Sequence, residues 1–233
     1  MVAGLTPQGA ASARWESDAN YLAVHETNLH LLVDATQGQA SIAGILSMRR
    51  SDGRTLNFEV LVKYPGLDPF QVPDAYDPVG RFPPSSERHV ERDGRFCLWL
   101  PPRAPRHRFR QPDGLSFFLD RVREFLRLQL TYETRVRRGK VPHWPGPEWG
   151  HGDDGYDEWA RENLADLDAD QIRTLLRLVE HPPRRAGERC ACGSGRRFGN
   201  CHKDVVRDLR AAWHDGDALA ACLRLLKERE HSA

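Results

Sequence analysis

Long apolar runs are missing from this 233-residue chain. No stretch approaches the about 18 consecutive apolar residues that a helix needs to cross a bilayer, so we predict no membrane-spanning helix. The N-terminal residues, MVAGLTPQGAASARWE, also lack a basic region followed by an apolar core. That pattern marks a secretion signal, and without it we expect a cytoplasmic protein.

An excess of charge of one sign is missing as well. The chain has 34 Lys and Arg residues against 33 Asp and Glu residues, which gives a formal net charge of +1. Proteins that bind nucleic acid or an anionic membrane through their overall field are strongly basic. We therefore expect neither nucleic acid nor a membrane among the partners.

Cysteine is scarce and unevenly placed. There are five cysteines, an odd number, and three of them fall within twelve residues near the C-terminus. A disulfide framework normally uses an even number of cysteines spread along the chain. We therefore predict reduced thiols in a reducing cytosol.

The hydrophobic pattern predicts an α+β fold. Three segments have the composition of strands and follow one another closely, which favours an antiparallel meander. In the third segment apolar and polar side chains alternate, as in a strand with one buried face. The expected elements are a helix over 12–28 and strands over 29–35, 40–49 and 56–65.

A proline-rich stretch follows the meander and excludes a central strand or a helix interior. Its prolines are Pro65, Pro69, Pro73, Pro78, Pro83 and Pro84. We therefore expect Cys97 to lie on a long ordered loop. Asp113 then predicts the N-cap of an amphipathic helix that runs to about Arg138 and covers the sheet. Beyond a connection over 139–155, residues 168–181 predict a second amphipathic helix.

The C-terminal segment contains the most specific motif. Cys190, Cys192, Cys201 and His202 supply three thiolates and one imidazole, the ligand types that zinc prefers. Four protein ligands leave no open position, so the predicted site is structural. The alternative is a set of reduced free cysteines on a loop. Two short helices are expected after the motif.

The segment CACGSGRRFGNCH resembles the SEC-C motif, a zinc-binding tail of many bacterial proteins. The match covers about twenty residues. It implies bound zinc and an adaptor role for the tail.

Cys97 allows two interpretations. Its apolar neighbours suit a core strand, in which the thiol would be an inert small hydrophobe. The preceding turn and the following prolines instead place it on a loop. Nearby cations would favour the thiolate and lower a pKa that starts near about 8.5, which suits an acyl carrier. These cations are Arg88, Arg92, Arg95 and Arg103.

The order of parts resembles a ubiquitin-conjugating enzyme over roughly residues 10–140. A helix, a meander, Tyr64-Pro65, a proline-rich stretch, DGRFCL and a further helix follow one another as in that family. Gly94 and Leu98 hold the family's positions around the cysteine. The resemblance implies the family's fold and a thioester on Cys97. It also implies three partners: a ubiquitin-activating-like enzyme, a ubiquitin-like modifier and a target protein.

Some positions depart from the family pattern. His89 stands at the place of an asparagine that stabilises the oxyanion, so the resemblance implies that His89 supports the attack of the target amine. The alternative is a loop histidine that only packs. Asp113 is implied to lie near the cysteine, although helix capping alone would explain it. Pro105 replaces a tryptophan. The pattern resembles bacterial members of the family, several of which belong to antiphage systems.

The resemblance divides the chain into three parts. Residues 1–145 would form the ubiquitin-conjugating-like domain, 146–186 a connection with an amphipathic helix, and 187–233 the zinc knuckle with its helices. Two other functions stay open: a catalytically silent binding module of the same fold, and a Cys-His hydrolase.

Two further features have simple explanations. The group His151, Asp153, Asp154 and Asp157 suggests a second metal site, or a solvated loop that caps the next helix. Cys222 lies on an apolar helical face and is expected in the core.

Overall fold

The protein is described by a computed structural model in two compact units. Met1–Leu98 and Pro105–Pro147 form the first unit, and Trp99–Ala104 and Glu148–Ala233 form the second. The described residues are 7–34, 36, 39–50, 52–64, 71–99, 104, 106–141, 143–146, 153–181, 185–212 and 216–231. Several residues discussed above lie outside them: Pro65, Pro69, Arg103, Pro105 and His151.

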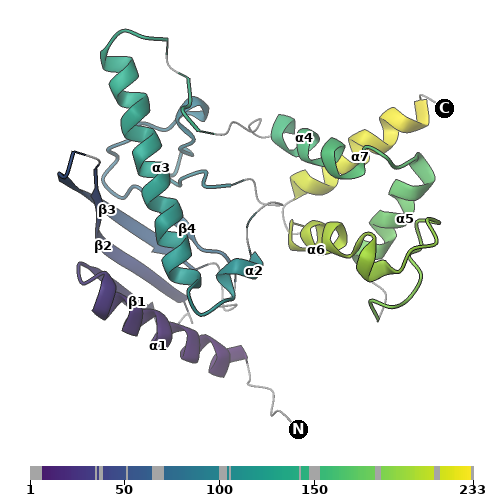
Figure 1. The fold of residues 1–233 in the computed structure, drawn as a ribbon, viewed down its shortest axis with the longest axis horizontal. Coiled ribbons are helices and arrows are strands. Elements are labelled where there is room, and N and C mark those ends of the chain that lie inside the picture. Colours follow the sequence, from purple (N-terminus) through teal and green to yellow (C-terminus); the bar gives the residue numbers. More distant parts are fainter. Residues whose placement is uncertain are drawn as a thin grey trace. The chain divides into compact units, whose positions relative to one another are not determined.

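The first unit contains a four-stranded antiparallel sheet in the order β1-β2-β3-β4. Helix α1 (Pro7–His25) precedes it and lies beside β1 (Figure 1). The strands are β1 (Leu29–Asp34), β2 (Gln39–Arg49), β3 (Thr55–Lys63) and β4 (Asp74–Tyr76). The predicted meander and the α+β class are confirmed, and the first three strands begin and end within two residues of the expected positions.

The alternation expected in β3 is present. Phe58, Val60 and Val62 are buried, whereas Asn57, Glu59 and Lys63 are exposed. Each buried side chain therefore lies on the same face of the strand. That face contributes to the hydrophobic core together with Ile42 and Leu46 of β2, with which Val62 and Phe58 are paired.

Strand β4 falls inside the proline-rich stretch that was expected to be irregular. It is only three residues long, lies between Pro73 and Pro78, and pairs with β3 through Leu61 and Tyr76. Proline has no backbone N–H to donate to a neighbouring strand. It is tolerated on either side of β4 because these positions lie outside the paired residues. On its other side the Ala75 carbonyl accepts a 2.8 Å hydrogen bond from Phe96 N–H. Strand β4 thus joins the sheet to the Cys97 segment.

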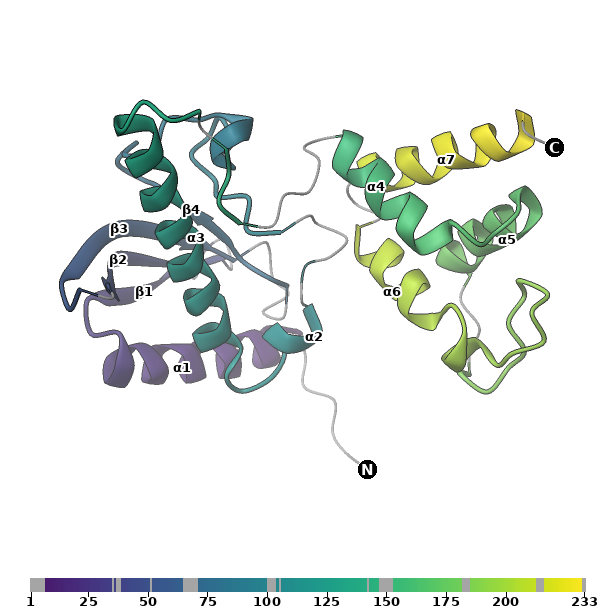
Figure 2. The same cartoon turned by 45° about the horizontal axis from the view of Figure 1, so that its top comes forward.

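The long helix predicted after Asp113 is confirmed as α3 (Gly114–Arg137), preceded by the short α2 (Arg106–Phe109). Figures 1 and 2 show α3 crossing the sheet. Arg123 of α3 donates to the Ser47 carbonyl of β2. The buried apolar residues of α3 recur at helical spacing: Leu115, Phe118, Leu119, Val122, Phe125 and Leu126.

The second unit is helical and has its own hydrophobic cluster. It contains α4 (Asp153–Leu164), α5 (Ala169–Glu180), α6 (Lys203–Ala212) and α7 (Gly216–His231) (Figure 2). Three of these helices were expected, and α5 begins at a capping box formed by Asp168 and Gln171. Residues of α4 and α5 share one cluster with the cysteine motif and α7.

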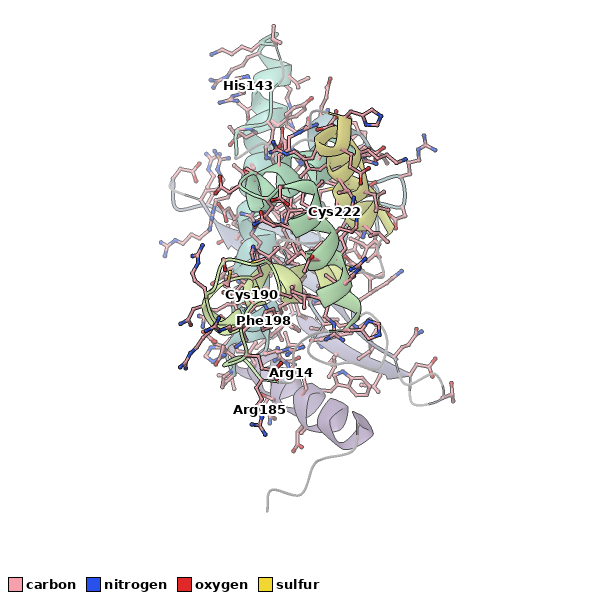
Figure 3. All side chains as sticks on the ribbon, turned by 90° about the vertical axis from the view of Figure 1, so that its right-hand side faces the viewer. Arg14, His143, Arg185, Cys190, Phe198 and Cys222 are labelled. Carbon is pink, nitrogen blue, oxygen red and sulfur yellow. The ribbon has the colours of Figure 1, made fainter. Side chains whose placement is uncertain are left out.

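Helix α4 was not expected, because its sequence was interpreted as a solvated loop. It is amphipathic and buries Tyr156, Trp159 and Leu164. Among the acidic residues proposed as a second metal site, Asp157 pairs with Arg224 at 2.7 Å. Cys222 is fully buried on α7, as predicted (Figure 3).

Within the described part of the chain, no helix is long and apolar enough to cross a membrane.

Candidate functional site

The cysteine motif forms a compact knuckle in the second unit. Arg189 and Arg197 pair as an antiparallel bridge, and Cys190 N–H donates to the Arg196 carbonyl at 2.8 Å. Between them the chain reverses through Gly193 and Gly195, both with positive φ. Glycine adopts this conformation without a steric cost, so the reversal brings Cys190 and Cys192 to one side.

The four predicted ligands converge. Their ligand atoms all lie within 4.8 Å of one another. His202 Nδ1 is 3.4 Å from Cys190 Sγ and 3.2 Å from Cys201 Sγ, and Cys192 Sγ is 3.6 Å from Cys201 Sγ. A tetrahedral ion with bonds of about 2.3 Å to sulfur and about 2.0 Å to nitrogen separates its ligands by about 3.5 to 3.8 Å. These side chains could therefore hold one metal ion.

The knuckle is supported from two directions. The short 3-10 turn Phe198–Asn200 leads into Cys201, and the Phe198 side chain is buried in the cluster of the second unit (Figure 3). From α5, Gln171 Nε2 donates to the Cys192 carbonyl at 3.2 Å. Helix α6 begins directly after His202. Core packing and a hydrogen bond from a side chain to the backbone therefore hold the candidate ligands in place.

The protonation chemistry of His202 and Cys192 suits a metal, whereas that of Cys190 does not. Burial and then the nearby Arg196 charge lower the pKa of His202, which favours the neutral imidazole that binds metals. Burial raises the pKa of Cys190 to about 11. Burial acts against ionisation of Cys192 too, but hydrogen bonding with Ser194 brings the pKa of Cys192 below its usual value.

Cys97 lies on a short extended segment in the first unit. Phe96 and Leu98 on either side are each only 4% exposed, whereas Cys97 is partly exposed. Phe96 packs against Phe125 of α3 with ring centroids 4.6 Å apart. The two neighbours anchor the segment in the core and leave the thiol at its edge. The thiol is therefore less buried than its two neighbours.

A tight turn precedes the cysteine. Glu91 N–H donates to the Arg95 carbonyl at 2.8 Å, and Cys97 N–H donates to the His89 carbonyl at 2.8 Å. Gly94 has φ +83°, and a Cβ there would lie 3.0 Å from the Asp77 carbonyl oxygen. Glycine is therefore required by both conformation and space.

Helix α3 holds this segment and the turn before it. The Arg121 guanidinium donates twice to the Leu98 carbonyl, at 3.1 and 2.9 Å. The buried Gln129 amide donates to the Arg88 carbonyl. In addition, Arg88 forms an ion pair with Glu133. The backbone on both sides of Cys97 is thus fixed to one helix.

The expected activation of the thiol is wrong. Burial raises the pKa of Cys97 to about 12, and the hydrogen bond to Glu91 and its charge add to this, while Arg95 acts weakly in the opposite direction. The lowering by Arg95 is outweighed, and two of the expected arginines are paired with carboxylates. Arg88 pairs with Glu133, and Arg95 pairs with Asp74 at 3.6 Å.

His89 is buried and has a left-handed backbone, with φ +53°. Its ring packs against Trp144 with centroids 4.4 Å apart. Its carbonyl oxygen accepts the hydrogen bond from Cys97 N–H.

Asp113 does not cap α3 with its side chain, so the expected capping hydrogen bond is wrong. Its backbone, at φ −90° and ψ 14°, is outside the extended conformation that aims an N-cap oxygen at the helix N–H groups. The carboxylate instead pairs with Arg108 of α2. Among the described residues, Glu91, Arg95 and Asp93 are charged groups that act on the Cys97 thiol.

Three residues near Cys97 were missed in the sequence: Glu91, Arg121 and Gln129. The Asp-Gly turn at residues 93 and 94 could have indicated Glu91, because such a turn brings the residues before and after it together. Gln129 is a polar residue on the apolar face of α3. Arg121 carried no comparable signal, since basic residues are common on exposed helix faces.

No protein-family model matches the sequence, and neither a curated protein nor a solved structure matches it.

Proposed function

We propose that the first unit is a ubiquitin-conjugating-like acyltransferase with the corresponding fold. Cys97 would accept the activated C-terminal carboxyl of a ubiquitin-like modifier as a thioester and pass it to an amine of a target protein. One observation carries this proposal. Cys97 is a partly exposed thiol on a segment whose backbone is fixed by β4, by the His89 carbonyl and by α3.

A fixed backbone matters for this chemistry because the acyl carrier must present its sulfur to two different partners in turn. Holding a reactive group in place avoids much of the entropy cost of each encounter. Phe96 and Leu98 anchor the segment in the core, so an acyl group on Cys97 can be carried without unfolding it. The implied partners are a ubiquitin-activating-like enzyme, the modifier and the target, in a cytoplasmic system of the bacterial antiphage type.

The second unit would hold a structural zinc ion and act as an adaptor. Three thiolates and one imidazole are a typical structural zinc set, and they leave no position for substrate. In a small knuckle, metal binding supplies much of the folding free energy. The zinc would thus order the segment between α5 and α6.

The test combines the protein with ATP and a ubiquitin-activating-like enzyme and modifier from the same genome. A non-reducing gel should show an adduct that added thiol removes. Cys97→Ala should form none, Cys97→Ser should form a thiol-resistant ester, and Cys222→Ala should behave like wild type because its side chain is buried in the second unit.

A second candidate is a catalytically silent protein-binding module of the same fold. It is favoured by the protonated state of Cys97, whose pKa is about 12, and by the packing of the His89 ring on Trp144. The absence of any adduct, with an activating enzyme shown to charge itself with the modifier, would support this candidate and exclude the transferase.

A further inference from the structure

The thiol of Cys97 has a specific partner. Its Sγ donates a hydrogen bond to Glu91 Oε1 at 3.2 Å. Within the described part of the chain, this is the one hydrogen bond of the Glu91 side chain, and the side chain forms no ion pair. Glu91 is otherwise exposed. Its carboxylate is therefore accessible to solvent and can exchange protons with it.

The pairing is a consequence of the turn before the cysteine. Gly94 N–H donates to the Glu91 carbonyl at 3.0 Å and Glu91 N–H donates back to the Arg95 carbonyl, which closes the turn. Cys97 N–H is bonded to the His89 carbonyl at the same time. Both backbones are thus fixed, and the carboxylate stays within reach of the sulfur.

The surrounding charges come from three elements. On the turn itself, Asp93 accepts a hydrogen bond from Arg95 N–H at 3.1 Å, and Arg95 extends to Asp74 of β4. From α3, Arg121 is bonded to the Leu98 carbonyl. Asp93, Arg95 and Arg121 thus each have another partner, whereas the Glu91 carboxylate is bonded to the thiol.

We propose that Glu91 is the catalytic proton acceptor of Cys97 in acyl transfer, and that it keeps the resting thiol protonated. This inference rests on the proposed transferase function. The two roles are compatible because a carboxylate beside a thiol disfavours a free thiolate, yet it can take the proton while the new bond to sulfur forms.

The acyl-transfer step balances without a redox change. Cys97 sulfur attacks the carbonyl carbon of the donor thioester, a C–S bond forms, and the S–H proton moves to Glu91. The tetrahedral intermediate then collapses, and the bond between the carbonyl carbon and the donor sulfur breaks. The departing donor thiolate takes the proton from Glu91. The products are the Cys97 thioester and a free donor thiol.

The first experiment measures the thiol alone and needs no conjugation partner. Metal-loaded wild type and Glu91→Gln are alkylated with iodoacetamide at pH 8, with Cys97→Ala as the blank. Removing the negative charge lowers the pKa of Cys97, so alkylation of Glu91→Gln should be faster by about tenfold or more. Asp93→Asn, the matched control, removes a charge from the same turn and should give a smaller increase. An unchanged rate in Glu91→Gln would overturn the proposal.

The second experiment measures acyl transfer on the same proteins. The donor is a short peptide ending in glycine, as its mercaptoethanesulfonate thioester, and intact mass reports the Cys97 adduct. A general base typically contributes at least about 10²-fold, so Glu91→Gln should lose about that factor although its thiol is more reactive toward iodoacetamide. Asp93→Asn should show no loss.

The outcomes separate the two proposals. Faster alkylation together with slower acyl transfer in Glu91→Gln supports Glu91 as the proton acceptor. Faster alkylation together with faster acyl transfer overturns the acceptor role, because Glu91 then only suppresses the thiol. Wild type that is alkylated as expected but accepts no acyl group, from the peptide or from a charged activating enzyme, overturns the transferase function and the acceptor role together.

Discussion

At the scale of single residues, the environment of a side chain in the first unit differs from what its sequence neighbours suggest. Cys97 has four arginines nearby in sequence, yet burial and Glu91 dominate its pKa. Arg14 and Asp18 of α1 are both buried and form a 2.9 Å ion pair, to which Tyr64 donates a hydrogen bond of 2.6 Å. Such a pair affects the free energy of unfolding because removing one partner leaves an uncompensated charge in the interior.

The pH dependence of Cys97 follows from its raised pKa of about 12. This value is above that of a free thiol, so the neutral form persists through the physiological range. The thiolate fraction should grow about tenfold per pH unit up to about pH 11. The alkylation rate of wild type, corrected with Cys97→Ala, should rise accordingly without a plateau. A plateau between pH 8 and 9 would contradict the structure around this thiol.

The buried pair in α1 predicts two different stability losses. Asp18→Ala removes the partner of Arg14 and should lower the free energy of unfolding by about 3 to 5 kcal/mol. Tyr64→Phe removes one hydrogen bond to Asp18 and should cost about 1 kcal/mol. Urea unfolding followed by circular dichroism measures both. If both variants lose the same free energy of unfolding, Asp18 is not required to compensate the buried charge of Arg14.

At the scale of elements, α3 does more than cover the sheet. Its apolar face builds the core, and its polar residues Arg121 and Gln129 bind carbonyl oxygens on both sides of Cys97. Tyr132 adds a 3.2 Å hydrogen bond to Glu87 in the turn before His89. One rigid helix thus positions a segment that has little regular structure of its own.

The Arg121 contact predicts a local effect. Arg121→Ala removes both hydrogen bonds to the Leu98 carbonyl and should cost about 1 to 2 kcal/mol in the free energy of unfolding. Hydrogen exchange of the amides near Cys97 should become faster. Arg127→Ala, on the exposed side of the same helix, is the control and should change neither quantity. Equal exchange in the two variants would argue against this positioning role.

At the scale of the whole molecule, the chain consists of two units with different means of stabilisation. The first unit has a sheet covered by a long helix. The second has short helices, and its knuckle consists largely of turns. Three of the four candidate ligands, Cys190, Cys192 and Cys201, share a cluster with residues of α4, α5 and α7, so a metal ion bound there would be coupled to helix packing.

Metal removal should therefore act on the second unit. A chelator such as 1,10-phenanthroline should reduce the helical signal in circular dichroism, because metal binding in such knuckles contributes about 10 kcal/mol or more. Cys201→Ser should have a similar effect. The pH dependence of the alkylation rate of Cys97 should be unchanged, since the contacts of Cys97 lie in the first unit. A helical signal that survives complete removal of the metal would contradict this coupling.

The sequence by itself determined the elements that depend on local periodicity and spacing. These include the first three strands, α3, α5, and the four candidate metal ligands of the knuckle. It missed α4, because the acidic residues and the glycine at the start of this segment are typical of a loop and made the helical spacing of its apolar residues hard to recognise. It missed β4 because three residues between prolines have no periodicity of their own and become a strand only by pairing with β3.

The tertiary structure alone decided the environment of each candidate catalytic residue. The burial of Cys97, the packing of His89 on Trp144 and the pairing of Asp113 with Arg108 all depend on which segments meet in space. The same holds for Arg121 and Gln129, which lie 24 and 32 residues after Cys97. A sequence pattern records residue types and spacing, whereas a pKa or a hydrogen bond depends on distances that only the folded chain sets.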